Sequence, residues 1–223
     1  MAIILNIDTA LETASVCLSS DEKILSFAEN KKQTDHASWL HSAIDAMLKK
    51  ENIEPGSIDA IAVSIGPGSY TGLRIGLSAA KGLCYALNIP LITIGTLELI
   101  AFAVKEEATE LICALIDARR MEVFTAVYDK KLNTELHPCA MIIDDKSFSE
   151  LLVKKNILFC GSGRKKLQNI LTHPHAFFSD TEMTAAHLSK IAYQYYREEK
   201  FADLAYTEPL YLKEFYSPAR KDS

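Results

Sequence analysis

The chain has 223 residues, of which 48% are apolar and 24% are charged, and its formal net charge is −5. This composition is typical of a globular protein and argues against any long disordered stretch. The negative charge excludes a general attraction to nucleic acid, and no apolar run reaches the roughly 18 residues that a membrane-spanning helix needs.

The cysteines and the first residues indicate a cytoplasmic protein. The number of cysteines is odd, and the closest pair, Cys139 and Cys160, is separated by 21 positions, so no cysteine zinc site is expected. Buried, reduced thiols fit this pattern. Residues 1–8 lack the basic region of a signal peptide and are predicted to form a first strand.

The first half of the chain alternates strands with helices. Apolar residues at every second position predict strands, and an apolar stripe with Lys49 and Lys50 at its end predicts the first helix. The expected strands cover residues 3–8, 14–19, 24–29, 58–65 and 91–94, and the expected helices cover residues 36–50, 70–87 and 96–104.

The charged stretch Lys105-Glu106-Glu107 is the best candidate for a boundary between two lobes, 1–104 and 105–223. After it the alternation begins again, and the tail from Thr207 is expected to pack back onto the body. Alternating strands and helices predict the α/β class. The expected strands are 111–116, 121–128 and 157–160, and the expected helices are 147–153, a basic one after residue 163, and 184–198.

Two segments resemble each other. Leu5-Asn6-Ile7-Asp8 and Ala114-Leu115-Ile116-Asp117 are both apolar strands that end in Asp and lead through a short turn into a second strand. This repeat predicts two related lobes that face each other. Such hairpins could hold magnesium and a nucleotide, which makes Asp8, Thr9 and Asp117 weak candidates for nucleotide binding. Alternatively, each Asp only ends its strand and caps a turn.

The segment from Gly66 to Gly76 is the densest motif in the chain. It follows a strand and opens a helix, so it could bind an anion at the helix N-terminus. It matches neither the Walker A loop nor GxGxxG. Gly68, Gly72 and Gly76 recur every four residues, and glycine in a helix costs about 1 kcal/mol relative to alanine, so a close contact is expected there. The sequence leaves open whether that contact lies within the chain or with another chain.

No catalytic or metal-binding residue is predicted. His36 and His41 lie about 140° apart on a helix and cannot share a metal ion, and HExxH is absent. GxSxG is absent as well, and no histidine is placed beside Ser69.

The chain resembles the TsaB (YeaZ) family, which takes part in tRNA threonylcarbamoyladenosine biosynthesis. The resemblance rests on Ile4 to Thr9, Gly66 to Gly76, Ala80 to Leu83, Asp117 to Arg119 and Pro209 to Lys213, and it covers nearly the whole chain.

This resemblance implies an actin-like (ASKHA) fold and a catalytic relative, TsaD. At the positions of the HxxxH metal pair in TsaD, this chain has Thr96 and Ile100, and neither can replace an imidazole. Ala10 stands where active ASKHA proteins usually have a glycine that lets phosphate approach. The resemblance therefore implies that the chain by itself has no catalytic site and no cofactor.

The resemblance also implies a role and partners. With TsaD and TsaE, the chain would be the non-catalytic subunit required for threonylcarbamoyl transfer to adenosine 37 of tRNAs that read codons beginning with A. ATP and metal would act in the partner subunits, and tRNA would bind only through the complex. Alone, the chain would form a homodimer through the surface that docks TsaD. That surface is expected to contain Leu40, Ile44, Tyr70, Gly72, Leu73, Gly76, Leu77 and Ala80.

Two alternatives remain open. A glycoprotease-type metallopeptidase would need bound zinc or iron, which elemental analysis would detect. A stand-alone ASKHA nucleotide-binding enzyme would bind ATP tightly, which calorimetry would detect.

Overall fold

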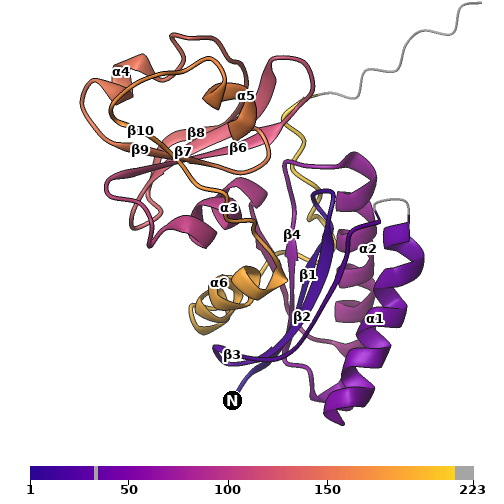
Figure 1. Ribbon diagram of the computed structural model, residues 1–223. Coiled ribbons are helices and arrows are strands. Elements are labelled where there is room, and N and C mark those ends of the chain that lie inside the picture. The colour runs from indigo at the N-terminus through magenta and orange to yellow at the C-terminus, as the bar shows by residue number, and fades with distance from the viewer. Residues whose placement is uncertain (33–34, 214–223) are drawn as a thin grey trace, which may run out of the picture.

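The computed structural model describes residues 1–32 and 35–213, which form two lobes with one five-stranded sheet each (Figure 1). The strand order is β3-β2-β1-β4-β5 in lobe 1, and β10-β9-β6-β7-β8 in lobe 2, which is the same order read backwards. In each lobe the first three strands pair antiparallel in sequence order, the fourth strand pairs in parallel with the first, and the fifth pairs in parallel with the fourth. The α/β class and the two related lobes of an actin-like fold are therefore confirmed.

Lobe 1 contains the first strands and the two long helices of the chain. Their bounds are β1 Ile3–Asp8, β2 Ala14–Ser20, β3 Lys23–Asn30, α1 His36–Glu51, the 3-10 turn η2 Pro55–Ser57, β4 Ala60–Ser64, α2 Tyr70–Leu87 and β5 Leu91–Ile94.

The linking helix α3, Thr96–Val104, connects lobe 1 to lobe 2. The elements that follow it are β6 Leu111–Asp117, β7 Glu122–Asp129, β8 Thr134–Ile142, α4 Ser149–Leu152, β9 Ile157–Cys160, α5 Arg164–Gln168, β10 Ala176–Phe178 and α6 Ala185–Arg197. Among the helices of the described residues, none combines the length and apolarity that crossing a membrane requires.

The sheet of lobe 1 is covered on both faces. Every residue of β4 is buried, as a parallel strand between two helical layers requires. In Figure 1, α1 and α2 lie side by side on one face and α6 lies on the other. Leu5 and Ile7 point toward the α1–α2 face and pack with Leu40 and Leu77, because side chains alternate along a strand.

Two helices, α3 and α6, each pack on the sheet of the other lobe, and we call this arrangement the exchange of α3 and α6. The last helix, α6, packs on β1, β2, β4 and β5 of lobe 1, where Leu188 and Ile191 join Ile4 and Ile92 in one core. Helix α3 follows β5 in the sequence but packs on β6, β7 and β9 of lobe 2. The division of the chain into lobes at residues 104 and 105 stays a prediction. Helix α6 lies after this division in the sequence but packs on the lobe before it.

Strands β8 and β10 were not predicted. Strand β8 contains Pro138 and lies at an edge of its sheet, where proline is tolerated because one side of the strand needs no ladder bonds. Strand β10 has only three residues, too few for a pattern. The weak signal of both strands follows from their place at the sheet edges.

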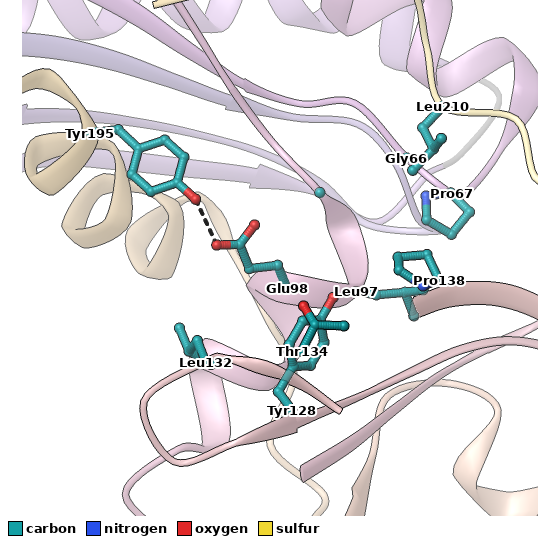
Figure 2. A pocket seen from close by; sticks show the side chains of 11 residues that line it. Gly66, Pro67, Leu97, Glu98, Tyr128, Leu132, Thr134, Pro138, Tyr195 and Leu210 are labelled. Carbon is teal, nitrogen blue, oxygen red and sulfur yellow. Dashed lines mark hydrogen bonds between the residues drawn. The ribbon is translucent and has the colours of Figure 1, made fainter. Parts of the chain in front are cut away.

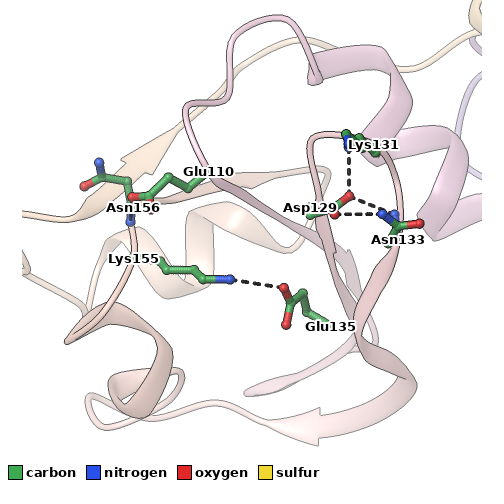
Figure 3. A network of polar contacts seen from close by, with 7 residues as sticks. All are labelled: Glu110, Asp129, Lys131, Asn133, Glu135, Lys155 and Asn156. Carbon is green, nitrogen blue, oxygen red and sulfur yellow. Dashed lines mark hydrogen bonds and ion pairs between the residues drawn. The ribbon is translucent and has the colours of Figure 1, made fainter.

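The turn between β7 and β8 is fixed by one carboxylate (Figure 3). Asp129 accepts hydrogen bonds from the backbone N–H groups of Lys131 at 2.8 Å and Asn133 at 2.9 Å, and from the Asn133 side chain at 2.9 Å. Leu132, in this turn, adopts a left-handed conformation with φ 65°. The turn thereby directs Leu132 and Thr134 toward lobe 1.

The segment after α6 returns along lobe 1. The Ala202 N–H donates to the Leu91 carbonyl at 2.8 Å, and the Leu210 N–H donates to the Ile65 carbonyl at 2.7 Å. Lys81 of α2 donates to two carbonyls of the same segment, each at 3.1 Å. The segment up to residue 213 therefore lies against lobe 1, and residues 214–223 of the predicted tail lie outside the described residues.

Candidate functional site

The glycine-rich segment contacts the first hairpin of its own chain. A Cβ atom added to Gly72 would collide with the Thr9 carbonyl oxygen, one added to Gly76 would collide with the Thr9 hydroxyl, and one added to Gly68 would collide with the Ala10 carbonyl oxygen. The Thr9 hydroxyl donates to the Gly72 carbonyl at 2.7 Å. The three glycines thus let the β1–β2 hairpin lie directly on α2.

This packing uses hydrogen-bonding groups at the N-terminus of α2. The Ser69 N–H donates to the Ala10 carbonyl at 2.7 Å. The Ser69 hydroxyl accepts from the Gly72 N–H at 3.3 Å and caps the helix. Groups that could have bound an anion are therefore bonded to the hairpin and to the cap, which argues against the anion-binding alternative for this loop.

Asp8 is enclosed at the end of β1. Its side chain is 1% exposed, and it accepts hydrogen bonds from the Ser64 hydroxyl and from the Ala10 N–H. Burial raises the pKa of this carboxyl to about 6, although the two hydrogen bonds oppose the shift. Thr9 is buried as well. Neither residue presents its side chain to a nucleotide in this conformation.

Asp117, the counterpart of Asp8 in lobe 2, lies in a different environment. It is exposed, forms an ion pair with Lys166 at 2.7 Å and accepts from the Arg119 N–H at 2.7 Å. Burial alone would raise the pKa of Asp117, but the bonds from Lys166 and Arg119 hold it below its usual value. The two aspartates occupy equivalent strand ends but have different partners, and their part in nucleotide binding stays a prediction.

Thr96 and Ile100, which the resemblance to TsaD aligns with a metal pair, are built into the core. Thr96 is fully buried; its hydroxyl accepts from the Gly66 N–H at 3.1 Å and its own N–H donates to the Gly66 carbonyl at 2.7 Å. Ile100 is 2% exposed and belongs to the core of lobe 2. Over residues 1–32 and 35–213, no group of three or more His, Cys, Asp or Glu residues is placed to hold a metal ion.

Most of the predicted docking residues face inward, which corrects the expectation that they form an open surface. The chain's own core buries them, and Gly72 and Gly76 are closed by Thr9. Tyr70 alone among them is partly exposed; its ring lies 4.9 Å from that of Tyr211 and 4.0 Å from the Arg74 guanidinium. The buried residues are Leu40, Ile44, Gly72, Leu73, Gly76, Leu77 and Ala80.

The opposite side of α2 is exposed. Arg74, Ser78, Gly82 and Tyr85 follow one another at helical spacing along it, and we call these four residues the outer stripe. Tyr85 is 82% exposed. A Cβ atom at Gly82 would meet nothing within 4 Å. The recurring glycines Gly72 and Gly76 lie on the other, buried side of the helix.

A cavity of about 340 Å³ lies between the lobes (Figure 2). Glu98 of α3 reaches into it and accepts a hydrogen bond from the Tyr195 hydroxyl of α6 at 2.8 Å. Burial, followed by the bond to Glu98, raises the pKa of Tyr195. Sequence reasoning missed this site, since its residues come from separate elements that only the exchange of α3 and α6 brings together.

Comparison with known proteins places this architecture in a family. Residues 26–214 match the family model of TsaD, tRNA N6-adenosine threonylcarbamoyltransferase. A protein from Escherichia coli (strain K12), tRNA threonylcarbamoyladenosine biosynthesis protein TsaB, is 29% identical over 219 residues, which cover 94% of each chain. The protein of the same name from Bacillus subtilis (strain 168) is 34% identical over 128 residues, which cover 57% of this chain and 56% of that protein.

Solved structures show the same fold. YeaZ from Pseudomonas aeruginosa superposes with a TM-score of 0.82 at 24% identity, over 95% of this chain and 100% of that chain. A further crystal structure, of a protein with similarity to peptidase YeaZ from Pseudomonas aeruginosa, has a TM-score of 0.84 at 24% identity over 96% of this chain and 100% of that chain. The family match, the relatives and the shared fold agree, and the chain belongs to the TsaB (YeaZ) family.

Proposed function

We propose that the chain is the non-catalytic subunit required, with TsaD and TsaE, for threonylcarbamoyl transfer to adenosine 37 of tRNAs that read codons beginning with A. The relatives that match it are named for tRNA threonylcarbamoyladenosine biosynthesis, and the matching family model is that of the transferase TsaD. The chain has the two-lobed fold of this family and acts in the complex as a partner subunit.

The positions of Thr96 and Ile100 support the proposal that the subunit is non-catalytic. Both side chains are committed to internal contacts, one to Gly66 and one to the apolar core. A threonine hydroxyl and the sec-butyl side chain of isoleucine are poor substitutes for two neutral imidazoles on a metal ion. ATP and metal therefore act in the partner subunits, and the chain has no cofactor of its own.

Transfer RNA binds through the complex. The net charge of −5 provides no broad attractive field for a polyanion. We expect the chain alone to show only weak, salt-sensitive affinity for tRNA in a gel-shift titration. Sub-micromolar binding by the isolated chain would contradict this part of the proposal.

The outer stripe of α2 is the surface that docks TsaD, and it forms the homodimer when TsaD is absent. A glycine inside a helix costs about 1 kcal/mol relative to alanine. Among the described residues nothing approaches Gly82 to offset that cost. Close approach of another backbone would do so, and the exposed Tyr85 ring beside it supplies the apolar area that anchors an interface.

Reconstitution tests the role. Purified chain, TsaD and TsaE are mixed with ATP, threonine, bicarbonate, the upstream adenylate-forming enzyme and unmodified tRNA, and modified adenosine is measured by mass spectrometry. Omitting the chain should abolish the product, and the chain alone should make none. Product formed in its absence would contradict the proposal, and elemental analysis and ATP calorimetry on the chain alone would separate the two alternatives.

Two variants test the docking surface. Gly82→Leu and Tyr85→Ala should each weaken association with TsaD about tenfold or more in analytical ultracentrifugation, because one blocks backbone approach and the other removes an anchor. Lys190→Leu, at an exposed position of α6, is the control and should associate normally. If both variants associate as tightly as the control, TsaD docks elsewhere.

A further inference from the structure

Among the described residues, those that line the interlobe cavity include none of the outer stripe and neither Asp8 nor Asp117. Its walls come from both lobes: Gly66, Pro67 and Leu210 on one side, and Tyr128, Leu132 and Thr134 on the other (Figure 2). Pockets for small molecules generally have volumes of roughly 300–1,000 Å³. At about 340 Å³, the cavity fits a compact ligand.

Glu98 provides the cavity with a negative charge. It lies in the first turn of α3, and its hydrogen-bond partner is the uncharged Tyr195 hydroxyl. No lysine, arginine or histidine is among the described residues that line the cavity. A carboxylate beside apolar walls and away from any counter-charge attracts a cation more strongly than one in open water does.

Tyr128 points to a ligand independently. It is 5% exposed, and its ring packs in the core of lobe 2 with Leu97 and Ile100. Tyr128 lines the cavity, and its hydroxyl forms no hydrogen bond within the described part of the chain. Figure 2 shows Tyr128 rising from lobe 2 toward Glu98 and Leu97. The hydroxyl is not one of the fully buried polar atoms that lack a partner among the described residues, so it is accessible from the cavity, where a ligand group can bond to it.

Burial, and then the charge of Glu98, raises the pKa of Tyr128. The phenol therefore keeps its proton at neutral pH and offers both an O–H donor and an oxygen acceptor. An anionic ligand would be repelled by Glu98, whereas an N–H donor with a positive charge could bond to the Glu98 carboxylate and to the Tyr128 oxygen together.

We propose that the interlobe cavity binds a small organic cation, a primary ammonium or guanidinium compound with a short apolar body. The charged group lies between Glu98 and the Tyr128 hydroxyl, and the apolar body contacts Pro67, Leu132 and Leu210. The site uses no residue of the outer stripe and does not depend on the tRNA-modification role.

A titration with matched four-carbon probes tests the site. Butylammonium and butylguanidinium are the cations, 1-butanol is the neutral probe and butyrate is the anionic one, and binding is followed by the amide NMR signals of Gly95, Leu97 and Glu98 in the full chain. Both cations should produce saturable shifts, with affinity about ten- to hundredfold above that of 1-butanol, as a bond to a charged group implies. Butyrate should produce none.

Variants identify the groups. Glu98→Gln keeps the shape and the bond from Tyr195 but should lower cation affinity to that of 1-butanol. Tyr128→Phe removes only the hydroxyl and should lower cation affinity about fivefold. Glu106→Gln makes the same change of charge at an exposed position outside the cavity, and should bind like the wild-type chain.

Three results would overturn the proposal: no saturable shift with either cation at millimolar concentration, equal affinity for the cations and 1-butanol, or unchanged cation affinity in Glu98→Gln. If Glu98→Gln does not give a native amide spectrum, Tyr128→Phe and the comparison of the four probes decide.

Discussion

Asp8 is a buried carboxyl group whose partners are a serine hydroxyl and a backbone N–H. Its pKa is about 6 in the folded chain, against 3.8 for an ordinary aspartate. Between about pH 4 and pH 6 the folded state therefore binds more protons than the unfolded state, and stability falls as the pH rises through this window. Ionised Asp8 should cost about 3 kcal/mol at neutral pH.

Asp8→Asn should remove this loss. Asn still accepts the bonds from Ser64 and Ala10 but does not ionise, so its stability relative to wild type should increase by about 3 kcal/mol from pH 4 to pH 7. Urea unfolding at several pH values measures the effect. Asp45→Asn, at an exposed carboxylate, is the control and should run parallel to wild type. If the unfolding free energy of Asp8→Asn changes with pH in the same way as that of wild type, Asp8 ionises normally in the folded chain.

Gly72 and Gly82 make a matched pair on the same helix. Gly72→Ala should destabilise the chain by about 1–3 kcal/mol, because the added Cβ meets the Thr9 carbonyl oxygen and forces the hairpin away from α2. Gly82→Ala adds the same atom in open space and should stabilise the chain by about 1 kcal/mol through helix propensity alone. Thermal unfolding of the two variants checks both signs, and equal effects would mean that Gly72 does not seat the hairpin.

At the scale of elements, the helices and strands that have a clear apolar periodicity could be predicted from the sequence. Helix α2 and strands β1 and β5 begin and end where the pattern placed them, because their apolar residues and capping groups mark both ends. Strand β8 has no such pattern. It is held by its pairing with β7 and by the Asp129 turn, and that pairing contains register shifts, so β8 lacks the strict alternation from which a strand is predicted.

The two sides of α2 illustrate the limit of element-scale reasoning. A stripe of small residues identifies a close contact, but it does not say which neighbour makes it. The resemblance predicts that Gly72 and Gly76 contact a partner chain, whereas in the structure they contact Thr9. The exposed Tyr85 lies nearly opposite, and only the position of the hairpin tells the two sides apart.

At the scale of the whole molecule, the repeat around Asp8 and Asp117 predicted two lobes of one topology. It could not predict the exchange of α3 and α6, because both helices are simply amphipathic segments that fit any sheet with an uncovered apolar face. The exchange creates the interlobe cavity, since it brings Glu98 of α3 to Tyr195 of α6. The cavity was therefore outside the reach of sequence patterns.

The exchange also makes the lobes depend on each other. Without α6, the fragment 1–104 would expose the face of its sheet that carries Ile4 and Ile92, both buried in the full chain. We expect this fragment to bind a hydrophobic dye and to show no cooperative melting by circular dichroism, because its exposed core forfeits most of the burial free energy that holds the sheet. Adding the fragment 105–223, which carries α6, should restore a cooperative transition. A sharp melting transition of 1–104 alone would show instead that lobe 1 is an independent unit, and that α6 only caps a sheet that folds without it.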